Sequence, residues 1–186
     1  MGSVARRRLQ TTAVIRRALS GTIKSGMQLC DIFLGLGPDS STALVRSISI
    51  GKLKTYQLFD RVKARFHVHK LNSEALRKVA PRCWERLESR DGEFATDLAQ
   101  AILVSHLDLI KDVLNRLGIP HEDGFFAKDA DASTYLKEGW QQTVVDEFSG
   151  KYPAPVLLFY INHLAWEVAK AEHVFTPAQQ AAQQVE

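Results

Sequence analysis

The amino-acid sequence predicts an all-α fold: a single-domain bundle of about six or seven helices with a basic N-terminal arm. Two observations carry this prediction. Apolar residues recur at helical spacing between Gly, Pro and N-cap signals over most of the chain. The alternating Val, Ile and Thr residues typical of strands are rare, and residues 45–50 are the only short candidate. We therefore expect helices joined by short turns.

The first half of the chain contains the signals for three helices. Residues 39–41, Asp-Ser-Ser, are candidate N-caps for a short helix that runs to Arg46. A longer helix is expected over residues 51–69, where apolar residues recur on one face. The next helix starts after the cap residues Asn-Ser at 72–73, and Pro81 divides it into two short helices or one kinked helix.

The strongest helical signal spans residues 92–117. Asp91 is its expected N-cap, Gly118 its expected C-cap, and Pro120 follows two residues later. Read at helical spacing, the apolar residues of this segment cover an arc of about 180°, which is typical of a central helix. The arc holds Leu98, Ile102, Leu103, His106, Leu107, Leu109, Ile110, Val113, Leu114 and Leu117. A loop is expected to follow over residues 119–131.

Two more helices are expected, over residues 133–148 and 153–172, the second with proline in its first turn. The expected domain organisation is therefore a basic arm or helix at 1–25, a helical domain at 26–176 and a flexible tail at 177–186.

Length and composition exclude several classes of protein. The chain has 186 residues, of which 45% are hydrophobic, and its net charge is +3. These values fall in the globular range and exclude disordered, collagen-like and disulfide-scaffold classes. The longest apolar run, residues 156–161, is far shorter than a membrane span. Two cysteines without CxxC or CxxH spacing make a structural zinc site improbable and favour free thiols.

The small net charge conceals a large asymmetry between the two halves of the chain. Residues 1–90 carry 18 Lys+Arg and 6 Asp+Glu, whereas residues 91–186 carry 6 and 15. Clustered like charges repel each other, so something of opposite sign is expected opposite the basic half. The candidates are the acidic half of the same chain with solvent and counterions, a nucleic acid, an acidic protein, or a second copy bound head to tail.

The first 25 residues contain no acidic residue, and their cations are interleaved with Ser and Thr. These cations are Arg6, Arg7, Arg8, Arg16, Arg17 and Lys24. This is the composition of a basic arm, and also that of an organellar transit peptide. The default expectation is a cytoplasmic protein, with an organelle matrix as the alternative if the segment is a targeting signal.

Two rows of cations at helical spacing support binding of a polyanion. Lys54, Arg61 and Arg65 share one side of the helix expected over 51–69. A second row steps by four residues: Lys78, Arg82, Arg86 and Arg90. Such rows match the way helices present cations to a phosphate backbone, although exposed basic faces also occur on proteins that bind no nucleic acid. The candidate contact residues are Arg6, Arg7, Arg8, Lys54, Arg61, Arg65, Arg82 and Arg86.

A second set of residues is compatible with a pocket between the central and last helices. His106 lies within the apolar arc of the central helix, while Tyr160, His163 and Glu167 follow one strip of the last helix. His163 and Glu167, at i and i+4, could hold a metal ion, but the Glu-x-x-His pairs of dimetal bundles are absent. The alternative for His106 is a neutral histidine in the core. The alternative for His163 and Glu167 is a hydrogen-bonded pair at the surface or between helices.

The sequence therefore favours a non-catalytic helical interaction module whose basic half engages nucleic acid or an acidic protein. It contains no G-x-S-x-G elbow, dinucleotide fingerprint or P-loop, and it predicts no cofactor. A homo-oligomer formed through the charge-complementary halves is a further possibility. The runner-up is an all-α enzyme or carrier that binds a metal or ligand at the second set of residues.

Overall fold

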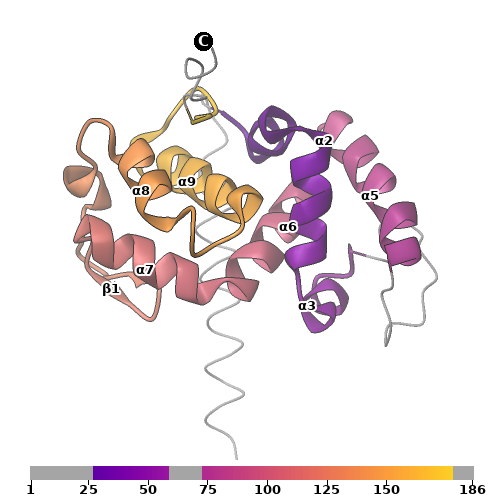
Figure 1. Ribbon diagram of the computed structural model, residues 1–186, viewed down its shortest axis with the longest axis horizontal. Coiled ribbons are helices and arrows are strands. Elements are labelled where there is room, and N and C mark those ends of the chain that lie inside the picture. The colour runs from indigo at the N-terminus through magenta and orange to yellow at the C-terminus, as the bar shows by residue number, and fades with distance from the viewer. Residues whose placement is uncertain (1–26, 59–72, 178–186) are drawn as a thin grey trace, which may run out of the picture.

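The computed structural model of the chain describes residues 27–58 and 73–177. Within these residues it contains seven α-helices, one 3-10 helix and a single small sheet of two strands (Figure 1). The predicted all-α bundle is therefore confirmed. The basic arm at 1–25 and almost all of the expected tail at 177–186 lie outside the described residues.

Helix α2, Leu29–Ser47, is the central element of the fold. It packs against α5 (Ser73–Glu88), α6 (Gly92–Ser105) and α9 (Ala154–Ala169), which surround it in Figure 1. A kink divides α2 at Gly37, whose φ of 85° favours glycine, directly before a proline. The sequence predicted the helix after this kink but not the helical segment before it.

Helix α3, Ile50–Thr55, is much shorter than the helix predicted over 51–69. Gln57 has a φ of 53°, a left-handed conformation that no helix continues through. The prediction of one continuous helix is therefore wrong, and the helical face that it assigned to Lys54, Arg61 and Arg65 is described only at Lys54. Residues 59–72 lie outside the described residues.

The predicted central helix over 92–117 is two helices, α6 and α7 (Leu107–Leu117), joined at His106. His106 has φ −130° and ψ 43°, and its ring Nδ1 lies 2.8 Å from the carbonyl oxygen of Ile102. The histidine predicted inside the apolar arc of one helix therefore occupies the joint between two. The predicted caps are confirmed: the Asp91 side chain accepts a hydrogen bond from Phe94 N, and Gly118 is left-handed.

The loop expected over 119–131 contains a hairpin. Strands β1, His121–Glu122, and β2, Phe125–Phe126, pair antiparallel. Asp123 and Gly124 between them both have positive φ, at 52° and 90°. Asp-Gly is the preferred sequence for this type of two-residue turn, so the signal was present in the chain.

The helix predicted over 133–148 is also divided. A 3-10 helix, η1 (Ala132–Tyr135), comes first, and α8, Trp140–Phe148, follows after a left-handed Gly139 with φ 73°. Helix α9 matches the last prediction, except that it ends at Ala169 rather than residue 172. Residues 171–177, here called the C-terminal strap, then turn back across the fold.

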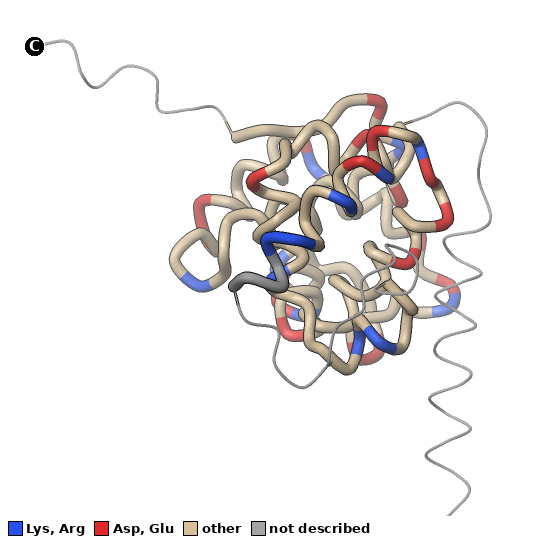
Figure 2. The backbone as a smooth tube through the Cα atoms, turned by 90° about the vertical axis from the view of Figure 1, so that its right-hand side faces the viewer, with Lys and Arg blue, Asp and Glu red and all other residues tan. Residues whose placement is uncertain are grey.

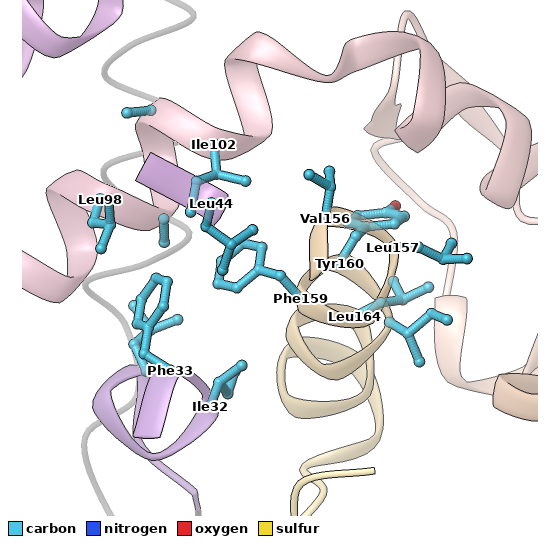
Figure 3. Packing of buried hydrophobic residues seen from close by; sticks show 14 of the residues in the cluster. Ile32, Phe33, Leu44, Leu98, Ile102, Val156, Leu157, Phe159, Tyr160 and Leu164 are labelled. Atoms are coloured by element: carbon cyan, nitrogen blue, oxygen red, sulfur yellow. The ribbon is translucent and has the colours of Figure 1, made fainter. Parts of the chain in front are cut away.

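The core lies where α2, α6 and α9 meet (Figure 3). Phe33 of α2 and Phe159 of α9 stack with their ring centroids 4.9 Å apart, and both are fully buried. Leu44, Leu98 and Ile102 lie around this pair in Figure 3. None of the helices in the described part of the chain is long and apolar enough to cross a membrane.

Candidate functional site

The described residues and the segments outside them differ in the sign of their net charge. The described residues carry 14 Lys+Arg and 19 Asp+Glu, a net charge of −5. Residues 1–26 carry six cations and no acidic residue, and residues 59–72 carry four cations and one acidic residue. The basic excess of the sequence therefore belongs to these two segments, and the described body is acidic.

The candidate cations fall into two groups. Arg6, Arg7, Arg8, Arg61 and Arg65 lie outside the described residues. Lys54 on α3 and Arg82 on α5 are both exposed to solvent, as the polyanion hypothesis requires. Arg77 and Lys78, one turn before Arg82 on α5, are exposed as well. Arg77 was missed because it does not fit the four-residue step of the row.

Arg86 differs from the other cations on α5 because its side chain is half-buried, at 31% exposed. Its Nε donates a hydrogen bond of 2.8 Å to Asp91, and its guanidinium lies 5.2 Å from the centre of the Phe94 ring. Asp91 in turn accepts from the backbone N–H of Phe94 at the start of α6. Arg86 thus ties the end of α5 to the first turn of α6, which is a structural role.

The face of the molecule that contains α5 carries both positive and negative charges. Figure 2 shows Lys and Arg interspersed with Asp and Glu over this face rather than gathered in a patch of one sign. Arg90, the last residue of the predicted row, forms an ion pair with Asp31 at the start of α2. Within α5, the exposed cations are Arg77, Lys78 and Arg82.

The acidic half of the chain neutralises part of its charge with its own cations. Lys111 pairs with Asp123 at 3.0 Å, Lys151 pairs with Asp112 at 2.5 Å, and Arg116 pairs with Glu147. These ion pairs connect α7 to the hairpin, to α8 and to the segment after α8. These three pairs use cations of the acidic half, whereas Asp91 is paired with Arg86 of the basic half.

Three of the four residues of the alternative pocket are neighbours on α9. Tyr160 and His163 are buried, and Glu167 is half-buried. His163 Nδ1 lies 3.5 Å from a carboxylate oxygen of Glu167, and the imidazole ring packs edge-on against Trp166 with centroids 5.7 Å apart. Tyr160, His163 and Glu167 therefore lie along one strip of α9, as predicted.

Burial determines the protonation of this strip. Desolvation lowers the pKa of His163, and the nearby Glu167 carboxylate opposes that shift only in part. Desolvation also raises the pKa of the Tyr160 hydroxyl. His163 is therefore a neutral imidazole at pH 7, and its buried Nε2 has no hydrogen-bond partner among the described residues.

The fourth residue, His106, binds a backbone carbonyl rather than a side chain. Its Nδ1 is hydrogen-bonded to the carbonyl of Ile102 within its own helix, at the joint of α6 and α7. In the described ranges 27–58 and 73–177, no three His, Cys, Asp or Glu side chains gather closely enough to hold a metal ion. His163 and Glu167 alone supply two ligands, fewer than a protein zinc site uses.

Neither cysteine is activated as a nucleophile. Cys30 and Cys83 are buried free thiols. Burial raises the pKa of Cys83 to about 12 and raises the pKa of Cys30 as well. Because the thiolate is the reactive form, both side chains act as small apolar core residues.

One polar residue of α9 that sequence reasoning missed makes specific contacts. Asn162 is fully buried, and its amide binds the backbone of Phe175 in the C-terminal strap. Its position as a polar residue inside the apolar sequence of α9 was the available signal, since a buried amide requires partners.

Comparison of the chain with protein-family models, with curated proteins and with solved structures finds no match. The residues and their geometry are therefore the basis for a functional proposal.

Proposed function

We propose that this protein is a non-catalytic helical binding module that engages nucleic acid through the basic segments 1–26 and 59–72 and the exposed cations of α3 and α5. One observation carries the proposal: the basic excess of the sequence belongs to two segments outside the described residues, which are themselves acidic. Two short segments contain ten cations against one acidic residue, while the described residues have a net charge of −5. Phosphate backbones bind such dense cations by releasing condensed counterions.

The types of cation favour a nucleic acid over other polyanions. Of the 18 cations in residues 1–90, 12 are arginines. The guanidinium group binds phosphate in a bidentate manner and stacks on aromatic faces, which nucleobases provide and acidic side chains do not. Arg82 on α5, together with Lys54 on α3, would extend the contact from the two segments onto the folded body.

The ion pairs of the acidic half support the same proposal. Lys111, Arg116 and Lys151 neutralise acidic residues around α7 locally. This local pairing reduces the competition that the acidic half offers to a phosphate backbone for the basic segments.

The test is the affinity of the full chain for a labelled oligonucleotide, measured for wild type and for Lys54→Glu/Arg82→Glu. Both positions are exposed, and circular dichroism of the variant checks that its helices are unchanged. We expect the double variant to bind about tenfold or more weakly, and equally so for unrelated sequences, because phosphate contacts carry no sequence information.

The matched control is Lys128→Glu/Lys137→Glu, which makes the same change in net charge at exposed positions of the acidic half. We expect this control to bind within about threefold of wild type, since only remote charge is altered. Equal losses in the two double variants, or an acidic protein that binds where oligonucleotides do not, would refute the nucleic-acid proposal.

A further inference from the structure

The C-terminal strap, residues 171–177, is held by a recognition contact of its own. The Asn162 side chain accepts a hydrogen bond of 2.6 Å from the backbone N–H of Phe175 and donates one of 3.0 Å to the carbonyl of the same residue. A second N–H of the amide donates to the carbonyl of Leu158 in α9. A single buried amide thus binds both backbone groups of one residue, as a neighbouring β-strand would.

A glycine of α2 provides the second contact of the strap. Gly35 lies under Val174 so closely that a Cβ built on the glycine would be 2.7 Å from Val174 Cγ2. Val174, Phe175 and Ala171 are partly buried and pack against the core. Asn162 and Gly35 therefore form a seat between α9 and α2 that binds the backbone of Phe175 and the branched side chain of Val174. Figure 1 shows the yellow strap lying beside the first part of α2.

The connection between α9 and the strap is short and conformationally unfavourable. Lys170 alone separates the last residue of α9 from the strap, and it is left-handed, with φ 52° and ψ 40°. Left-handed geometry is uncommon for residues other than glycine, asparagine and aspartate. The turn is closed by a 3.1 Å hydrogen bond from Ala171 N to the Ala165 carbonyl. The strap therefore reaches its seat only while a lysine stays in a disfavoured conformation.

From this geometry we infer that the seat formed by Asn162 and Gly35 also accepts the C-terminal strap of a second copy of this chain, which yields a strap-exchanged dimer. The exchange preserves the two hydrogen bonds to Phe175 and the packing of Val174 on Gly35. It also allows Lys170 to leave the left-handed conformation, because an open connection need not reverse direction. Short, strained connections are the setting in which identical elements exchange between protomers.

The seat binds a segment of this chain, so a second copy of the chain carries a segment that fits it. The competing process is binding of the strap to its own seat, which a short connection favours with an effective concentration in the millimolar range. The wild-type chain is therefore monomeric at low concentration and exchanges straps as the concentration rises. This inference is independent of the proposed nucleic-acid function.

The test changes the length of the connection in the full chain. Deletion of Lys170 prevents the strap from turning back onto its own seat, whereas insertion of Gly-Ser-Gly after Lys170 removes the strain and gives slack. Molar mass is measured by light scattering during gel filtration at about 50 µM, well below the millimolar effective concentration of a tethered strap. We expect the deletion variant to be dimeric, with a dimer fraction more than about tenfold above wild type, and the insertion variant to be monomeric.

Loss of the seat identifies the exchanged segment. In the deletion background, Asn162→Leu removes the hydrogen bonds to Phe175 and should return the chain to a monomer. Asn115→Ala, at an exposed hydrogen bond on α7, is the matched control and should stay dimeric.

A deletion variant that keeps its helical spectrum but stays monomeric, with the Phe175 amide unprotected from hydrogen exchange, would overturn the inference. A dimer that forms equally in the insertion variant would overturn it too, because its interface would then not involve the strap.

Discussion

Gly35 of α2 and Val174 of the C-terminal strap pack so closely that no Cβ fits between them: a Cβ on Gly35 would lie 2.9 Å from Val174 Cβ. Gly→Ala in a helix ordinarily stabilises a protein by about 0.5–1 kcal/mol. At Gly35 we expect the opposite sign, a loss of about 1–3 kcal/mol in the free energy of unfolding, because the methyl group overpacks the contact. Urea denaturation measures the change.

Two comparisons separate overpacking from a general effect of alanine. Gly51→Ala in α3, where a Cβ meets no atom within 4 Å, should leave stability unchanged or raise it by up to about 1 kcal/mol. Adding Val174→Ala to Gly35→Ala should recover part of the loss in a double-mutant cycle. Additive effects of the two substitutions would contradict the close contact.

Asn162→Leu should destabilise the fold by about 2–4 kcal/mol. The substitution nearly preserves size but leaves the backbone N–H and carbonyl of Phe175 without their partner, and unpaired buried polar groups are costly. Hydrogen exchange supplies the specific readout, since the Phe175 amide should lose protection before the amides of α9. Asn115→Ala, at an exposed hydrogen bond to His121, is the control and should cost less than about 1 kcal/mol.

His163 should make the fold sensitive to acid. Burial lowers the pKa of His163 in the folded state below its ordinary value of 6.5, so the unfolded chain binds the proton more readily. Its contribution to stability is complete above pH 6.5 and is lost as the pH falls below it, with a slope of at most about 1.4 kcal/mol per pH unit. Unfolding free energies measured from pH 8 to 5 should show this decline.

The matched variants for this pH dependence are His163→Leu and His173→Gln. His163→Leu removes the buried imidazole, so the decline between pH 6.5 and 5 should become shallower whatever its effect on stability at pH 8. His173 is exposed, and its substitution should leave the slope unchanged. A slope that is the same in all three proteins would show that His163 does not cause it.

Asp112→Asn should weaken the contact between α7 and the segment after α8. Hydrogen bonds from Lys151 and Tyr152 lower the pKa of Asp112. Its contribution is therefore present above its unfolded pKa and is lost as the pH falls through the lowered folded value. Because Asp112 is partly exposed, we expect a loss of about 1 kcal/mol at pH 7 that diminishes as the pH falls below the ordinary pKa of 3.8.

Asp123→Asn is the control for Asp112, since Asp123 also pairs with a lysine but its side chain is 90% exposed. We expect a change below about 0.5 kcal/mol there, because exposed ion pairs contribute little. Asparagine also tolerates the left-handed conformation of this turn residue. Similar losses at both positions would mean that the hydrogen bond from Tyr152 adds nothing.

The fold class and the helix ends marked by caps could be predicted from the sequence. Asp91 and Gly118 carry local signals, a side-chain acceptor and a residue without Cβ, and both act as predicted. The break at His106 carries no such signal, because the apolar pattern continues through it and packing of the two helices decides it. The left-handed Gln57 that ends α3 is equally invisible to residue preferences.

The candidate site was predictable only in part for a related reason. Composition reveals where cations are concentrated, but tertiary contacts decide that Arg86 binds Asp91 and Phe94 while Arg82 remains exposed. Likewise, the spacing of His163 and Glu167 predicted their proximity on one helix. It could not reveal that His163 Nε2 is buried with no hydrogen-bond partner in residues 27–58 and 73–177.

The most direct test of the central claim is the salt dependence of oligonucleotide binding by the full chain, with a chain lacking residues 1–25 measured in parallel. The proposal predicts an association constant that falls steeply and linearly with salt on logarithmic axes, and a slope for the shortened chain that is smaller by several released counterions. No binding at low salt, or a slope unchanged by removal of the basic arm, would contradict it.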